Sequence, residues 1–152
     1  METLERIIAE HPFCAGLENR FTSLIVGCAS NVRFNKGDYI FREGDPADTF
    51  YLVREGKVAV EISAPQRRPI NIATLTQGEI LGWSWILPPF QWKHDARAVD
   101  SVRAIALDGK CLRGKCEENH DFGYEVMKRF ARIIEQRLES TRLQLLDVYA
   151  VR

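Results

Sequence analysis

The spacing of apolar residues divides the chain into three segments, and the first of them is predicted to be helical. From residue 2 to 29, apolar side chains recur every three or four positions, which is typical of a helix. The pair His11-Pro12 interrupts this period, and a residue that precedes proline disfavours the helical backbone. We therefore expect two short helices rather than one.

The middle segment, from residue 32 to 108, is predicted to form β-strands. Its apolar residues come in six short runs, namely VRF, YIF, TFYLV, KVAVEI, INIATL and VRAIAL. Most of these runs are rich in β-branched or aromatic residues, as strands are, and turn-forming segments separate them. No segment between them is long enough for a crossover helix. The pattern therefore predicts a sandwich or barrel and not a parallel sheet.

The last segment, from residue 120 to 148, returns to a helical period. Its stripe consists of Met127, Phe130, Ile134, Leu138, Thr141, Leu145 and Val148. A helix of this length extends beyond a small barrel, so part of the stripe needs a partner. The simplest partner is the same helix of a second copy, and we expect a homodimer. The alternative is a helix that packs entirely on its own domain.

Size and composition fit a single folded domain. The chain has 152 residues, of which 45% are hydrophobic and 28% charged, and these values are ordinary for globular proteins. We expect N-terminal helices over residues 1–30, a β-domain over 31–108 and C-terminal helices over 109–149, all within one domain.

The charge and the N-terminus indicate a protein that works away from nucleic acids and membranes. The formal net charge at pH 7 is zero, so no overall positive field attracts nucleic acid or anionic lipid. No apolar run approaches the length of a membrane span. The start, METLERIIAE, lacks the basic and apolar regions of a secretion signal. We expect a cytoplasmic location and no membrane partner.

The cysteines are expected to be reduced thiols, because the cytosol keeps thiols reduced. They are Cys14, Cys28, Cys111 and Cys116. The closest pair stands in C-L-R-G-K-C, which is wider than the tight pairs typical of zinc and iron–sulfur sites. We expect no metal and no resident cofactor.

The glycine spacing after Phe34 carries a resemblance to a known family. The stretch FNKGDYIFREGDPADTFYLVREGKVA places glycine at 37, 44 and 56. It resembles the cyclic nucleotide-binding domain of the catabolite activator and protein kinase A regulatory subunits. The resemblance implies a β jelly-roll barrel, short N-terminal helices, a long C-terminal helix and a regulatory function in signal transduction. Glycine suits such turns because it adopts positive φ at little cost.

The alternative is a metal-binding cupin, which also has a β-barrel. A cupin needs clustered histidines with a carboxylate on inward strand positions. The histidines here are His11, His94 and His120, and two of them fall in predicted helical ends. The sequence therefore favours the regulatory family over a cupin enzyme.

In that family a short helical cassette with the pattern F-G-E-[LI]-[AG]-L, followed by R-[ST]-A, holds the nucleotide. The resemblance implies a glutamate on the ribose, an arginine on the phosphate and backbone N–H groups at the helix N-terminus. In LGWSWIL, Gly82 matches the glycine, but Trp83 stands at the glutamate position and is followed by Ser84 and Trp85.

The arginine position of the cassette falls on a third tryptophan. Counting back from VRAIALD places Trp92 there, followed by Lys93 and His94, whereas a shift of one residue would place Lys93 there. An indole offers one N–H donor and no charge, so we expect binding of cAMP or cGMP to be lost or weakened. The alternative is a working cyclic nucleotide receptor in which Lys93, His94 and Arg97 compensate.

The tryptophans have two interpretations. In the first, which we favour, they fill the vacated pocket; in the second they line a pocket for another flat or apolar ligand. Thr141 and Arg142 lie where family members cap the base, and are candidate base-capping residues.

Taken together, the sequence predicts a regulatory or sensor module that acts through an unidentified protein partner. The catabolite activator adds a helix-turn-helix after its long helix, but about four residues follow Val148 here, so we expect no direct DNA binding. No paired carboxylates, metal cluster or nucleophile constellation indicates an enzyme.

Overall fold

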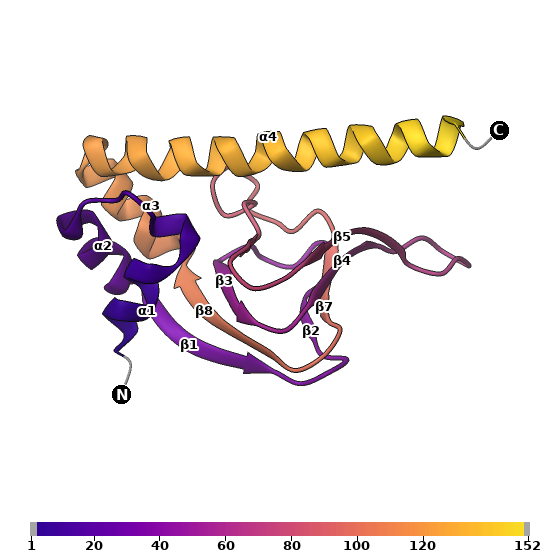
Figure 1. Ribbon diagram of the computed structural model, residues 1–152, viewed down its shortest axis with the longest axis horizontal. Helices are drawn as coiled ribbons and strands as arrows, with labels where there is room; N and C mark the ends of the chain where they lie inside the picture. The colour runs from indigo at the N-terminus through magenta and orange to yellow at the C-terminus, as the bar shows by residue number, and fades with distance from the viewer. Residues whose placement is uncertain (1–2, 151–152) are drawn as a thin grey trace.

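The computed structural model describes residues 3–150 and consists of two β-sheets spanned by one long helix (Figure 1). The helical elements are α1 (Leu4–Glu10), the 3-10 helix η1 (Pro12–Cys14), α2 (Asn19–Val26), α3 (Gly109–Glu118) and α4 (His120–Ala150). The strands are β1 (Ala29–Phe34), β2 (Tyr39–Phe41), β3 (Thr49–Glu55), β4 (Val58–Ile62), β5 (Ile70–Leu75), β6 (Ile80–Leu81), β7 (Asp95–Ala98) and β8 (Val102–Asp108). The predicted pair of N-terminal helices is confirmed, since α1 ends at Glu10 and α2 begins at Asn19.

The strands form two four-stranded antiparallel sheets, in the orders β1-β8-β3-β6 and β2-β7-β4-β5. The mainly β, jelly-roll-like fold is confirmed, but the sheets do not close into a barrel. Each sheet ends in a very short strand, β6 with two residues and β2 with three. Strands of that length offer too few backbone groups to extend the hydrogen-bonded ladder from one sheet to the other.

Two apolar cores hold these layers together. One lies between the helices and the first sheet and includes Phe50, Leu107 and Phe130. The other lies between the two sheets and includes Val58 and Leu75. The segment that connects β6 to β7 contributes Trp85 to the first core and Trp92 to the second. Its position is therefore fixed by both cores.

The turn glycines that carry the resemblance have the predicted backbone. Gly37, Gly44 and Gly56 have φ values of 91°, 90° and 91°. At Gly56 an added Cβ would also overlap the carbonyl oxygen of Ser101, so this turn has room for glycine alone.

Helix α4 runs along one side of the whole molecule, with its first half on the helical core and its last turns on the side of the projecting β4–β5 hairpin (Figure 1). Arg129 fixes the first half by donating to the carbonyl oxygens of Phe13 and Ala15, both at 2.8 Å. Phe130 belongs to the domain core and is 1% exposed. Contrary to the prediction from the apolar stripe, it is therefore not available to a partner helix. Within residues 3–150, no helix is both long and apolar enough to cross a bilayer.

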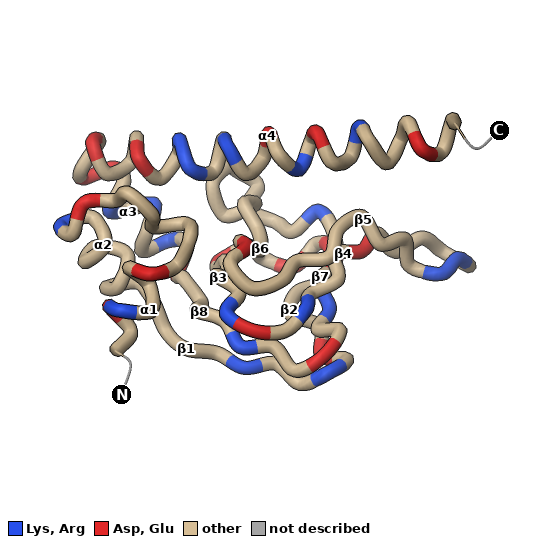
Figure 2. Tube along the Cα trace, in the orientation of Figure 1, with Lys and Arg blue, Asp and Glu red and all other residues tan. Residues whose placement is uncertain are grey.

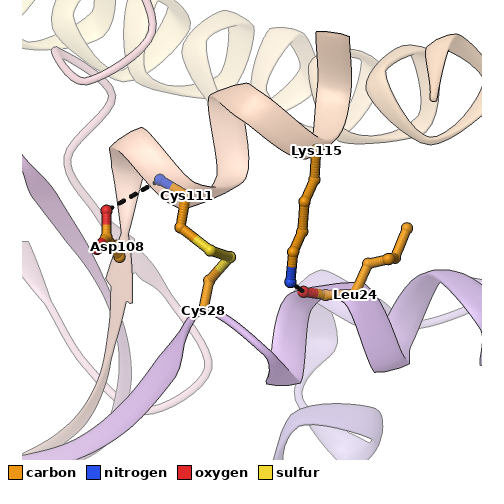
Figure 3. Close-up of a disulfide and its surroundings, with 5 residues drawn as sticks. All are labelled: Leu24, Cys28, Asp108, Cys111 and Lys115. Atoms are coloured by element: carbon orange, nitrogen blue, oxygen red, sulfur yellow. Dashed lines mark hydrogen bonds between the residues drawn. A yellow bond between two sulfur atoms is a disulfide. The ribbon is translucent and has the colours of Figure 1, made fainter. Parts of the chain in front are cut away.

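The expectation of reduced cysteines is wrong for two of the four, because Cys28 and Cys111 form a disulfide (Figure 3). Cys28 precedes β1, and Cys111 lies in the first turn of α3, where Asp108 accepts a hydrogen bond from its backbone N–H at 3.0 Å. Lys115 on the next turn donates to the carbonyl oxygen of Leu24 at 2.8 Å. Three interactions therefore bind the start of α3 in place, and two of them join it to the end of α2.

The other two cysteines, Cys14 and Cys116, are free. Burial raises the pKa of both thiols to about 11. The thiolate is the reactive form of cysteine, so both side chains are poorly reactive at neutral pH in the folded protein.

Thiol titration tests the disulfide. Unfolded without reductant, the protein should show two reactive thiols, and after reduction all four. The bond closes a loop of 83 residues, so reduction should lower the free energy of unfolding by about 2–4 kcal/mol. The control Cys116→Ser should respond to reductant as the wild type does. Four reactive thiols before reduction would show that the bond is absent.

Candidate functional site

The segment between β6 and β7, residues 82–94, contains no helix. Its local backbone bonds are those of turns, such as the one from the N–H of Ile86 to the carbonyl oxygen of Trp83 at 3.1 Å. A helix N-terminus binds anions through several aligned N–H groups, and this segment does not provide that arrangement. The short cassette helix that the resemblance implies is therefore missing from this part of the chain.

Trp85 fixes this segment to the helical core. Its ring is fully buried and stacks on Phe50, with centroids 4.7 Å apart and planes 10° apart. It also meets the edge of Phe130 at 5.3 Å. Arg113 of α3 donates a hydrogen bond to its carbonyl oxygen. Trp85 is therefore a structural residue; it borders a small cavity of about 290 Å³ beside α3 and the start of α4, with Arg113 and Met127.

Trp92 fills the space between the two sheets. Its ring is 4% exposed and stacks on Phe41, with centroids 3.7 Å apart and planes 5° apart. Gly82, at φ 98°, lies directly against this ring, and a Cβ at this position would overlap it. Trp92, which one register of the family pattern places at the arginine position, is thus a buried indole packed against the cassette glycine.

Trp83 differs from the other two, because it is half-buried and lines an open cavity of about 590 Å³. The walls of this cavity come from the β4–β5 hairpin, the cassette and α4. Its lining includes Val60, Ile72, Leu75, Glu79, Trp83, His94, Ile134, Arg137, Leu138, Thr141 and Gln144. The tryptophans therefore divide the two roles considered from the sequence: Trp92 fills space, and Trp83 forms a pocket wall.

Arg137 of α4 is the cation of this cavity, and the sequence interpretation missed it. Its guanidinium lies over the Trp83 ring, 5.2 Å from the centroid, and donates to the carbonyl oxygen of Ile80. Burial lowers the pKa of Arg137, and the Glu79 carboxylate opposes that effect. One signal was available, since Arg137 lies four residues before Thr141 and so on the same helical face.

The cations proposed to compensate for the lost arginine are largely elsewhere. Arg97 forms a bidentate pair with Glu61 at 3.1 and 3.2 Å, and Lys93 is exposed and outside the cavity lining. His94 does line the cavity, and burial, with the nearby Arg137 charge, lowers its pKa. At neutral pH this imidazole is therefore neutral and cannot replace a phosphate-binding arginine.

The remaining candidates are also separated. Thr141 lines the cavity and donates to the carbonyl oxygen of Arg137 at 2.8 Å. Arg142 points away, is exposed and lies 3.8 Å from Glu139. Ser84 is half-buried and outside the cavity lining. In residues 3–150, no three His, Cys, Asp or Glu side chains converge as a metal site would require.

The end of the cassette is fixed by Asp95, the first residue of β7. Its carboxylate accepts from the backbone N–H of Glu43 at 2.8 Å and from the Ser63 hydroxyl at 2.6 Å. Burial would raise the pKa of Asp95, but these hydrogen bonds and the Arg42 charge outweigh it and hold the pKa below its usual value. The charged carboxylate thus links β7 to two other segments.

The sequence model of the cyclic nucleotide-binding domain matches residues 31–119, more than half of the chain. The chain belongs to this family. The matched residues begin in β1 and end after α3, so they include both sheets and the whole cassette.

Relatives of known description agree with this membership. A CRP-like cAMP-activated global transcriptional regulator of Mycobacterium tuberculosis is 25% identical over 145 residues, which are 95% of this chain and 63% of the regulator. The chain thus spans less than two thirds of that relative. A Geobacter metallireducens protein described as cyclic nucleotide-binding has 28% identity and a TM-score of 0.79, covering 91% of this chain and 99% of the other.

A third match concerns the fold alone. The regulatory subunit of a cAMP-independent protein kinase A from Trypanosoma brucei has 20% identity and a TM-score of 0.76. It covers 96% of this chain and 50% of its own length. In this cyclic nucleotide-binding domain, then, the family fold surrounds a cassette of a different composition.

Unfolding in urea should separate the roles of the two tryptophans. Trp92→Ala removes a buried stacked ring and should lower the free energy of unfolding by about 3–5 kcal/mol. The matched control Trp83→Ala removes a half-buried ring and should cost less than about 2 kcal/mol. Equal losses in the two variants would contradict the assignment of Trp92 to the core and of Trp83 to the cavity wall.

Proposed function

We propose that this chain is a non-enzymatic regulatory module whose cavity does not bind cAMP or cGMP in the manner of the family. The observation that carries the proposal is the position of Trp92, which lies buried against Gly82 and Phe41 where the family pattern has its phosphate-binding arginine. The cassette also lacks a helix whose N-terminus could receive the phosphate. Both loss of charge and loss of backbone donors therefore disfavour a cyclic phosphate there.

Desolvation is the physical reason to expect weak binding of a cyclic nucleotide here. An anion removed from water without a compensating cation loses several kcal/mol even after relaxation, and each 1.4 kcal/mol is a tenfold change in affinity. Trp83 at the position of the ribose-binding glutamate offers no acceptor for a ribose hydroxyl. Micromolar binding of a cyclic nucleotide in that pose is therefore not expected.

A working cyclic nucleotide receptor is the second candidate function. The open cavity beside Trp83 favours it, since about 590 Å³ lies in the usual range for small-ligand sites. The name of the Mycobacterium tuberculosis relative, which is described as cAMP-activated, also favours it. Because the chain spans only part of that relative, activation by cAMP remains a proposal for this chain.

Thermal unfolding with and without cAMP and cGMP distinguishes the two functions. A ligand at a hundred times its Kd would raise the melting temperature by roughly 5–10 °C. We expect shifts of less than about 1 °C at 1 mM of either nucleotide, because no cassette cation receives the phosphate. A shift of several degrees with cAMP would reject the first function and support the second.

We further propose that α4 forms a coiled-coil homodimer. Eight residues of α4 repeat at alternating steps of three and four, and all of them are exposed: Tyr124, Met127, Ala131, Ile134, Leu138, Thr141, Leu145 and Val148. Three of them, Ile134, Leu138 and Thr141, also line the cavity beside Trp83, so the proposed seam borders that cavity. This heptad spacing is the pattern of a two-helix seam. Acidic and basic residues are mixed along α4 (Figure 2), and the longest run of like charge is Lys128, Arg129 and Arg132 near its start.

Sedimentation at micromolar concentration tests the dimer. The wild type should sediment as a dimer, and Leu145→Asp, which buries a charge at the seam, should shift it to monomer. Leu145 is 56% exposed and Leu87 on the cassette is 70% exposed, so Leu87→Asp is a matched control that should remain dimeric. A wild type that stays monomeric at the highest concentration would refute the proposal.

In this proposal the module acts through another protein that contacts α4. Basic and acidic residues are mixed over the described elements (Figure 2), and this mixing supports the expectation that the chain does not bind DNA directly. The cytoplasmic location expected from the sequence remains a prediction.

A further inference from the structure

The cavity beside Trp83 contains one cation whose charge has no partner within the site. Among the residues that the structure describes, no carboxylate lies within ion-pair distance of Arg137. The residues three and four positions away on α4 are Ile133, Ile134, Ser140 and Thr141, so the helix supplies no acid. A buried charge without a counterion is unfavourable.

Glu79 is the acidic residue among the cavity-lining side chains. Its carboxylate turns back to its own loop, where it accepts from the backbone N–H of Thr76 at 2.7 Å and from the Thr76 hydroxyl at 3.4 Å. It therefore offsets the Arg137 charge only from a distance. The guanidinium uses one of its several N–H groups on Ile80 and retains others for a ligand.

His94 adds a neutral imidazole to the lining of the same cavity. Its Nδ1 atom is shielded from solvent and has no hydrogen-bond partner within residues 3–150. A ligand in the open cavity would therefore meet the imidazole ring and not this atom. The cavity thus combines a cation, a neutral imidazole and the Trp83 ring face.

We propose that Arg137 is the anion-binding residue of this cavity and that the ligand is a planar ring compound carrying one carboxylate. The guanidinium fork matches a carboxylate in a bidentate geometry, and the indole offers a face for the ring. A single negative charge suits a site with one cation and Glu79 nearby. This inference rests on the proposed function, because it assumes that the cassette no longer holds a cyclic phosphate.

Because Arg137 lies on α4, a ligand bound to its guanidinium would contact this helix directly. In the family pattern the arginine that binds the anion belongs to the cassette. Arg137, the residue proposed to bind the anion here, belongs to α4, the helix that carries the proposed dimer seam. Arg137 already links α4 to β6 through Ile80 and to the cassette through Trp83. A ligand bound to its guanidinium would therefore change contacts of α4 itself, as coupling between a site and a helix requires.

The experiment compares 2-naphthoate with 2-naphthamide, which share a ring system and differ in charge. Both are titrated into the full chain and followed by calorimetry and by tryptophan fluorescence. The wild type should bind the carboxylate roughly ten- to a hundredfold more tightly, because its hydrogen bonds to Arg137 are charge-assisted. In Arg137→Gln that preference should disappear while the amide still binds.

Two further variants serve as controls for the role of Arg137. Arg137→Lys keeps the charge but not the fork, and should retain part of the preference. Arg142→Gln changes an exposed arginine of the next turn that lies outside the cavity lining, and should keep the full preference. The preference is a ratio within one variant, so a general loss of stability does not mimic its loss. If Arg137→Gln does not fold, an undiminished preference in Arg137→Lys overturns the inference.

Three other results would overturn it: equal binding of the two probes to the wild type, a preference that persists in Arg137→Gln, or no binding of either probe up to its solubility. Failure of the proposed function is distinguishable, because it appears as stabilisation by cAMP. Stabilisation by cAMP that Arg137→Gln abolishes would support the role of Arg137 and reject the proposed function. Stabilisation that survives this substitution would reject both.

Discussion

The packing of the Trp92 ring between Phe41 and Gly82 is the constraint on which the rest of the site depends. The ring stacks on Phe41 with centroids 3.7 Å apart and lies against Gly82, where an added Cβ would overlap it, so it occupies space between the sheets. The remaining cavity lies outside this plug, against α4, and its cation therefore comes from the helix. The cation of the described cavity, Arg137, thus lies on α4, while an indole, Trp92, lies in the core between the sheets.

Much of the fold could be predicted from the sequence, because it follows local patterns. Apolar periodicity gave the helices and the longer strands, and the glycine spacing gave the turns and the family. The strands β6 and β7 were missed for physical reasons. β6 has two residues, and β7 is the polar stretch DARA, in which Arg97 is satisfied by Glu61 of the neighbouring strand. Only the three-dimensional pairing shows that such a polar segment is a strand.

The site was partly predictable in the same way. The family pattern located Gly82, Trp83 and Trp92, and the cavity borders the predicted Thr141. Arg137 was missed because the helical period tells which residues share a face but not what lies opposite that face. The disulfide was missed because 83 residues separate its cysteines, and the expected location argued against it. Contacts of both kinds join residues that are far apart in the sequence, and a local pattern does not show which residues meet.

The disulfide between Cys28 and Cys111 has a mechanical consequence for α4. The bond joins the first turn of α3 to the segment between α2 and β1, and Lys115 of α3 also donates to Leu24 of α2, so the distance between these helices is restrained at two points. Asn119 is the single residue between the end of α3 and the start of α4, and its backbone is extended, with φ −132° and ψ 97°. The first turns of α4 that follow Asn119 are held on the same helical core by buried Phe122, Val126 and Phe130, so only the part of the long helix beyond this core is free of the disulfide-linked base.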